Sequence, residues 1–474
     1  MSEDARELYQ QRLHRYVTAC YNGMPDRIPI RVFAEELAAK YAGYSNFDAA
    51  VDHELQFDVN RKFATELGCD AVQTNSIVNW MGMMKAIGWK GIYFPGIGLP
   101  VESCTQWTEP SNEENAFMKA DEYDRFIDDP TAFLLEAWLP RFTEHIRAVG
   151  DPVTFEHSMS LINGVLAYNL FFNTWARKHE ELVASGVVPA VSSVLKAPLD
   201  ILGDKLRGYV NLVYDLHERR EKVIAACKTL MPHLFHLVSR GADPEHNIPS
   251  IIWMHRGCVP YITPRDFDEI YWPTLKPIVE ELWAQGQQIV FYAEGNWDHH
   301  LEAFAELPEK SIIFHVDKTD IFKAHETFGH KFSISGGVPN ELLAIGTQDD
   351  IRSYCKKIIN GVAREGGYIM DAGSLILDDV KIENIKAMID FTREHGVYSQ
   401  PMQTDSLEDI KKSARPEPED HRFKEQGRKP GVCIPWDEKK KVLPSITGDE
   451  DQDRKIWEMI DAMGYFFLWV NLTW

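Results

Sequence analysis

Several predicted strands in the second half of the sequence end in side chains that can carry acid–base chemistry. Apolar, β-favouring runs lead into the groups His255, Tyr292, Glu294, His315, Asp317 and Asp371. Imidazole, phenol and carboxyl groups can transfer protons, and imidazole and carboxylate can also bind a divalent metal. The sequence contains neither a compact HExxH motif nor a glycine-rich phosphate loop. The pattern therefore indicates acid–base or metal chemistry and disfavours a nucleotide cofactor.

Strand patterns alternate with helix patterns from about residue 186 onward. We expect strands at 187–195, 248–255, 289–294, 311–317, 332–337 and 368–373, each followed by a helical stretch. Two earlier strands, near 27–33 and 70–75, bring the total to eight. Eight parallel βα units predict an α/β fold, a TIM-type (β/α)8 barrel, with a doubly wound sheet as the alternative.

A long excursion and a C-terminal extension interrupt this regular pattern. We expect one barrel domain over residues 1–402 with an insertion at 76–186, and a tail with a terminal helix over 403–474. The tail is charged and Pro-rich up to about 455, which suits a wrapping segment or a solvated linker equally. The apolar face of 452–474 suits packing on the body, or on a second copy in a homodimer.

Barrel enzymes carry their chemistry at the carboxyl ends of the strands, so the fold predicts which side chains meet. The catalytic candidates are His255, Tyr292, Glu294, His315 and Asp371. The substrate-binding candidates are Asn75, Asn296 and Asp317, together with Trp80 and Met83 from the excursion, which would form part of an apolar lid.

Composition restricts the kind of partner. The net charge is −22, from 50 basic and 72 acidic residues, so nucleic acid and anionic membranes would be repelled. No apolar run reaches the roughly 18 residues that a membrane span requires. The seven cysteines form no CxxC pair, and the sequence does not start with a secretory signal pattern. A reduced, cytoplasmic protein is expected.

Several motifs in order resemble the uroporphyrinogen decarboxylase superfamily of TIM barrels. They are the run 262–267 on to Pro273, Gly295-Asn296, Gly336-Gly337-Val338-Pro339 with Leu342-Leu343 and Gly346-Thr347, and 383–388. The decarboxylase branch has an early Arg-rich motif, whereas residues 27–36 here turn acidic. The thiol-methylating branch has His-x-Cys where this chain has Tyr292-Ala293-Glu294.

A third branch, the corrinoid-dependent aryl ether O-demethylases, is more similar. The resemblance implies transfer of a methyl group from a small phenyl methyl ether to the reduced cobalt of a separate corrinoid protein. The corrinoid would belong to that partner, because this chain lacks an Asp-x-His-x-x-Gly motif. A decarboxylase of the uroporphyrinogen type and a methylcobamide:thiol methyltransferase remain the alternatives.

The resemblance also implies a zinc motif, Glu-x14-Glu-x20-His, which Glu294, Glu309 and His330 match in spacing. Glu294 ends a predicted strand, whereas Glu309 and His330 precede predicted strands. That placement would put them at opposite ends of the barrel, too far apart for one ion with bonds of about 2 Å. We therefore expect Glu294 to work with His255, His315 and Asp371, and Glu309 and His330 to have structural roles.

Overall fold

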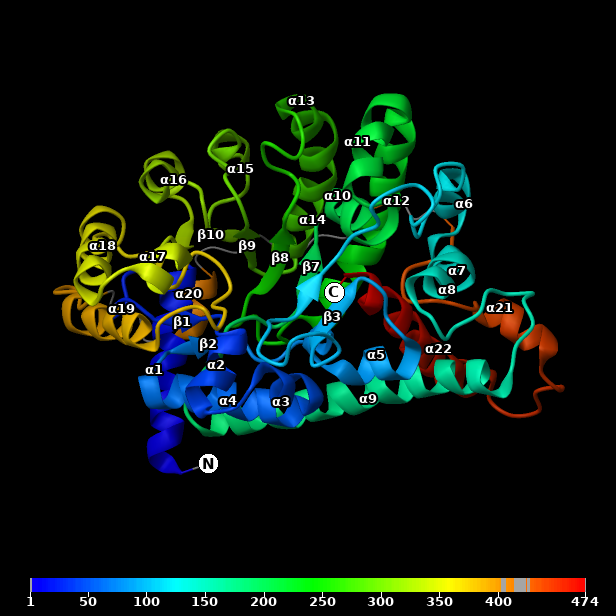
Figure 1. Cartoon of the computed structure of the whole chain (residues 1–474), viewed down its shortest axis with the longest axis horizontal. Coiled ribbons are helices and arrows are strands. Elements are labelled where there is room, and N and C mark those ends of the chain that lie inside the picture. Colours follow the sequence, from blue (N-terminus) through cyan, green and yellow to red (C-terminus); the bar gives the residue numbers. More distant parts are fainter. Residues whose placement is uncertain (1, 402–405, 413–422, 424–426, 474) are drawn as a thin grey trace.

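Runs of Ile, Val and Phe form the strands around which the chain folds. The computed structural model describes residues 2–401, 406–412, 423 and 427–473 (Figure 1). Its central strands are β1 (Arg31–Val32), β2 (Ala71–Val72), β6 (Val188–Pro189), β7 (Val194–Lys196), β8 (Ser250–Met254), β9 (Ile289–Ala293), β10 (Ile312–Val316), β11 (Ser333–Gly336) and β12 (Tyr368–Ile369). They lie where the sequence predicts eight strands, because β6 and β7 are two halves of the third.

Parallel pairing closes these strands into a barrel. One run of neighbours is β1-β2-β6 and the other is β7-β8-β9-β10-β11-β12, all parallel. The chain itself joins β6 to β7. Between β12 and β1 the Arg31 amide donates to the Met370 carbonyl at 3.0 Å, and the Met370 amide donates to the Pro29 carbonyl at 2.9 Å. The predicted TIM-type barrel is therefore confirmed.

Helices follow the strands and cover the outside of the barrel. They are α2 (Glu35–Ala42), α3 (Asn46–Val51), α4 (His53–Leu67), α10 (Pro198–Ile201), the π-helical η3 (Leu202–Arg207), α11 (Tyr209–Glu218), α12 (Arg220–Gly241), α13 (Pro264–Asp266), the π-helical η4 (Phe267–Tyr271), α14 (Trp272–Ala284), α15 (Leu301–Phe304), α16 (Ile321–Phe328), α17 (Asn340–Ile345), α18 (Gln348–Gly361) and α19 (Ile382–His395). Their buried faces pack on the strands in one continuous core.

The first helix, α1 (Glu3–Cys20), covers the amino-terminal end of the barrel. Its last carbonyls have no partner within the helix, and side chains from the barrel satisfy them. The Gln288 amide donates to the Cys20 carbonyl at 2.6 Å, and the Ser333 hydroxyl donates to the Ala19 carbonyl at 2.5 Å. The Tyr16 hydroxyl reaches the Ala190 carbonyl at 2.8 Å. The opposite, carboxyl-terminal end is left for a site.

The excursion after β2 is more ordered than the sequence suggests. It holds η1 (Ile77–Asn79), α5 (Met81–Ile87), a small sheet of β3 (Ile92–Pro95), β4 (Gly98–Leu99) and β5 (Gln106–Trp107), then α6 (Tyr123–Asp128), α7 (Pro130–Phe133), η2 (Leu134–Trp138), α8 (Leu139–Phe142) and α9 (Phe155–Ala184). Figure 1 shows α9 running along the lower edge, beneath α3, α4 and α5. This 30-residue helix returns the chain to β6.

The C-terminal tail packs on the body wherever the structure describes it. Its elements are α20 (Leu407–Lys412), α21 (Trp436–Lys439), η5 (Lys440–Val442) and α22 (Glu450–Thr473); residues 413–422 lie outside the described part. Trp469 of α22 stacks on His233 of α12, with ring centres 4.1 Å apart. The helix therefore docks on the body, and Figure 1 shows it running toward β7. Across the described residues, no helix combines the length and apolarity needed to cross a membrane.

Candidate active site

A cavity of about 470 Å³ opens at the carboxyl-terminal end of the barrel. Residues after five of the strands line it, as do side chains from the excursion and Thr473 at the end of α22. The strand-end groups in its wall are Glu35, Gln73, Lys196, His255 and Glu294. Aromatic rings from Trp107, Phe117, Phe142, Trp253 and Tyr261 also line it. The cavity thus combines a flat apolar surface with several charged groups.

Two predicted residues, His255 and Glu294, meet in this cavity. The Nε2 atom of His255 lies 3.5 Å from Oε2 of Glu294, and Nδ1 lies 2.9 Å from Oδ2 of Asp204. The same Asp204 oxygen accepts from the ammonium of Lys196 at 2.7 Å. The Trp253 indole N–H donates to Oε1 of Glu294 at 2.9 Å. Contacts on both sides therefore fix the imidazole and the Glu294 carboxylate in place.

The surrounding charges determine the proton affinity of His255. Burial has the largest effect and would lower the pKa of His255, as would Lys196. Asp204 and Glu294 outweigh both and raise its pKa above the ordinary value. For Asp204, burial would raise the pKa, but Lys196 and His255 lower it overall. The two carboxylates therefore favour the protonated form of the imidazole between them.

A buried carboxyl beneath the cavity holds the loop that carries His255. Both oxygens of Asp200 accept backbone amides, from His255 at 3.0 Å and from Arg256 at 2.8 Å. The Tyr271 hydroxyl donates to the same carboxyl at 3.0 Å. Burial raises the pKa of Asp200 to about 6. The turn after β8 is thus set by hydrogen bonds rather than left free.

Glu35, the first residue of α2, is another carboxyl in the cavity wall. Burial, and then repulsion from Glu36, raises the pKa of Glu35 to about 8. At neutral pH its carboxyl is therefore predominantly protonated. A neutral carboxylic acid facing a cavity can donate a proton to a bound ligand. The strand-end pattern did not select Glu35, because two residues separate it from β1, whereas Glu294 follows β9 at once.

The other catalytic candidates lie deeper, inside the barrel. Tyr292, His315 and Asp371 are fully buried, and none of them lines the cavity. The Arg31 guanidinium, which is also buried, donates to Asp371 at 2.8 Å and lies 2.8 Å from Nδ1 of His315. Burial and the Arg31 charge lower the pKa of His315 well below its usual value. Tyr292 stacks on His315 at 4.3 Å. These residues form a polar layer that fills the barrel.

The candidate substrate-binding residues are dispersed. The Asn75 amide donates to the His53 carbonyl at 3.2 Å, and the Trp80 ring stacks on Phe171. Met83 is fully buried. All three residues therefore pack in the interior of the excursion and its neighbours. Asn296 is exposed in the turn after β9. Asp317 lines a smaller hollow of about 390 Å³ that shares Glu35 with the main cavity.

The zinc-motif residues do not come together. Glu294 follows the end of β9, whereas Glu309 precedes β10 and His330 precedes β11, and both of these are exposed. Five strand residues separate the two ends of β9, a span of roughly 16 Å. Within the part of the chain that the structure describes, no three His, Cys, Asp or Glu side chains are close enough to hold one metal ion. The motif residues therefore do not fit a shared zinc ion.

The sequence patterns did not select three further charged residues of the cavity wall, Lys196, Asp204 and Lys205. Lys196 ends the third strand, so the same strand-end rule would have found it. Asp204 and Lys205 lie on the π-helical η3, after the strand and a helical turn, where no strand-end signal exists.

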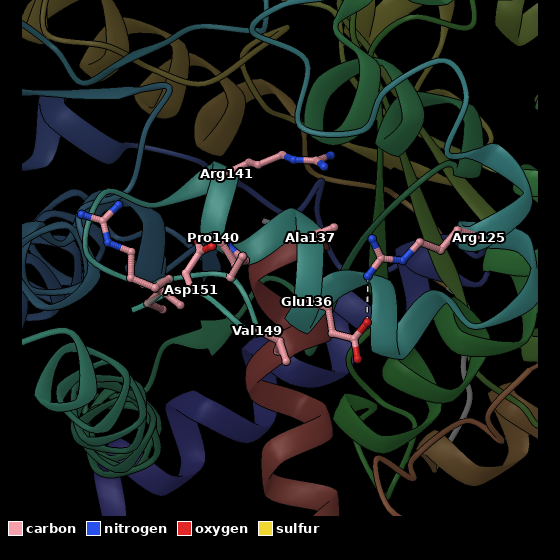
Figure 2. A pocket seen from close by; sticks show the side chains of 10 residues that line it. Arg125, Glu136, Ala137, Pro140, Arg141, Val149 and Asp151 are labelled. Atoms are coloured by element: carbon pink, nitrogen blue, oxygen red, sulfur yellow. Dashed lines mark hydrogen bonds and ion pairs between the residues drawn. The ribbon is translucent and has the colours of Figure 1, made fainter. Parts of the chain in front are cut away.

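A second hollow, of about 480 Å³, lies on the excursion between α6, α8 and the loop to α9 (Figure 2). Two of its arginines have acidic partners, because Arg125 pairs with Glu136 at 2.7 Å and Arg141 pairs with Glu122 at 2.5 Å. None of the strand ends reaches it. The barrel mouth is therefore the better candidate for chemistry.

Comparisons with known proteins agree with this fold. Residues 185–395 match the model of the family described as Uroporphyrinogen decarboxylase (URO-D), which confirms the superfamily that the sequence motifs indicated. No curated protein is similar enough to count as a match. Among solved structures, a methyltransferase from Methanosarcina mazei has a similar fold, with a TM-score of 0.50 and 17% sequence identity over 80% of this chain and 97% of that one.

Proposed function

We propose that the protein is a methyltransferase that takes the methyl group of an aryl methyl ether and passes it to the reduced cobalt of a separate corrinoid protein. The observation that carries the proposal is the cavity itself. It combines aromatic walls, suited to a flat ring, with a neutral carboxyl at Glu35 and the His255–Glu294 pair. The similar fold of a methyltransferase and the Tyr292-Ala293-Glu294 sequence in place of His-x-Cys support the same reading.

The chemistry requires help for the departing oxygen. As the methyl carbon leaves, the oxygen becomes a phenolate, whose conjugate acid has a pKa of about 10. Expelling the bare anion near neutral pH is costly, so a proton donor lowers the barrier. Glu35 would donate that proton to the oxygen, while Glu294 and His255 would orient the ring and its substituents. The partner protein would approach at the open end of the barrel.

Decarboxylation of a porphyrinogen is the competing activity, because the matching family carries that name. The cavity argues against it. In its wall the charges of Lys196 and Arg256 are already paired with Asp204 and Glu109, which leaves few cations for the many carboxylates of such a substrate.

The test is a reconstituted transfer assay. Reduced corrinoid protein, this protein and a guaiacol-type ether should give the absorbance change of a methylated corrinoid together with free phenol. Glu294→Gln should abolish the transfer while the far-UV circular dichroism stays unchanged. Retained transfer would remove Glu294 from the mechanism, and carbon dioxide released from a porphyrinogen would favour the decarboxylase instead.

A further inference from the structure

Lys205 is a buried cation that faces the cavity. It lies on η3, directly after Asp204, and the two side chains serve different parts of the cavity wall. Asp204 bonds to Lys196 and His255, whereas the ammonium of Lys205 lies 5.3 Å from the centre of the Trp107 ring and 5.4 Å from that of Phe142. Only 5% of Lys205 is exposed. The residue therefore presents its charge between two aromatic rings.

The two partly buried cations of the cavity wall have acidic partners. Lys196 pairs with Asp204 at 2.7 Å, and Arg256 pairs with Glu109. Among the described residues, no carboxylate lies within 4.0 Å of the Lys205 ammonium, and no hydrogen bond from it is formed. Cation–π contacts compensate an ammonium less than a carboxylate does. Burial, and then the charge of Lys196, lower the pKa of Lys205 to about 7.

A buried cation without an anion is destabilising unless a ligand supplies the anion. A methoxyphenol cannot supply it, because a phenol is neutral near pH 7. An aromatic carboxylate can, and its ring would lie against Trp107 and Phe142.

We propose that Lys205 binds the carboxylate of the substrate, so that the ethers used by this protein are methoxylated aromatic carboxylic acids. Calling the ligand a substrate rests on the proposed function, but the anion site itself can be tested without methyl transfer. Lys205 acts in binding and orientation, and the ether bond reacts elsewhere in the same cavity.

The experiment is isothermal titration calorimetry without the corrinoid protein. The ligands are 2-, 3- and 4-methoxybenzoate and the three matched methoxybenzamides, which keep the shape and lose the charge. Wild type should bind at least one benzoate about tenfold or more tightly than its amide. Lys205→Met should remove that preference and leave amide binding unchanged. Lys90→Met removes an exposed cation at the rim of the same cavity and should keep the preference.

Proton uptake gives a second readout. Carboxylate binding should raise the pKa of Lys205, so wild type should take up protons at pH 8, measured in buffers of different ionisation enthalpy. The pKa values of Glu35 and His255 are also raised in this cavity, and Lys205→Met retains both groups, so loss of the uptake in that variant assigns it to Lys205. A preference that survives in Lys205→Met, or no binding of any benzoate by wild type, would overturn the proposal.

The two hypotheses fail separately. Benzoate binding through Lys205 without methyl transfer from any methoxybenzoate would leave the anion site standing and reject the transferase. Methyl transfer from neutral ethers, with no preference for benzoates, would support the transferase and reject the role of Lys205.

Discussion

At the scale of single residues, two carboxyl groups in one cavity are in opposite protonation states. Asp204 stays ionised between Lys196 and His255, whereas Glu35 is held protonated because desolvation and the neighbouring Glu36 raise its pKa. This difference lets one part of the cavity wall hold a negative charge while another part donates a proton. The proton of Glu35 is available only below its pKa of about 8.

This protonation state predicts a pH dependence. The donor must be protonated, so kcat for methyl transfer should fall as the pH rises through about 8. Glu35→Gln, which keeps the shape but cannot donate an acidic proton, should lower kcat by about 10²-fold or more and flatten the high-pH limb. Steady-state rates between pH 6 and 9.5 check this. Glu36→Gln removes the neighbouring charge, so it should keep the high-pH limb but move it to lower pH. An unchanged pH limb in Glu35→Gln would assign the proton to another group.

The sequence identified only part of the site for physical reasons. His255 and Glu294 could be predicted, because strand ends in a barrel share one face. Tyr292, His315 and Asp371 also come from barrel strands, but they point into the barrel. There His315 and Asp371 bond to Arg31, a residue 284 positions away from His315. Alternation along a strand does not show whether an inward side chain reaches the mouth or stays in a lower layer. The pairing of Lys196 with Asp204 depends on a π-helix that no sequence pattern marks.

At the scale of elements, α22 joins the C-terminal tail to the site. Trp469 is fully buried, stacks on His233, and its indole N–H donates to the Thr131 hydroxyl at 3.2 Å. Four residues later, Thr473 lines the cavity. The apolar face of the terminal helix predicted that the helix packs on the body or on a second copy. The sequence could not decide between the two, because the contact on the body is made by rings from α12.

Removing that anchor should loosen both the fold and the site. Trp469→Ala leaves a large cavity, and we expect it to lower the free energy of unfolding by about 3–5 kcal/mol. It should also weaken binding in the main cavity, because Thr473 loses its support. Denaturant unfolding measures the first effect and ligand titration the second. Met459→Ala, at a position on the same helix that is 64% exposed, should change stability by less than about 0.5 kcal/mol; equal losses in both variants would contradict this account.

Elements of the fold were predicted better than the site. The barrel strands could be found because short apolar runs between helical patterns have few other interpretations. The sequence shows no regular strand or helix pattern over 76–150, yet the excursion holds a small sheet and several short helices. Its strands are two to four residues long, too short for a period to show.

At the scale of the whole molecule, the net charge of −22 opposes the approach of an anionic ligand, while Lys205 would hold it once bound. Long-range repulsion between exposed charges is screened by salt, whereas a buried ion pair is screened much less. The rate constant for association of a methoxybenzoate should therefore rise by about two- to fivefold from low to moderate ionic strength, with little change in dissociation. Stopped-flow tryptophan fluorescence measures both. A falling association rate would show that the local cations dominate the field at the mouth.

The way α1 covers the base of the barrel has a consequence for the order of events during synthesis. α1 is translated long before the residues that cap its last carbonyls, Gln288 and Ser333, the latter 314 positions beyond Ala19. Tyr16 and the rest of that apolar face share one buried cluster with Ile313 and Ile369, so the face is incompletely covered until nearly the last strand has been translated. A nascent chain of this protein therefore carries a partly uncovered apolar helix through most of its synthesis, which is the kind of segment that holding chaperones bind.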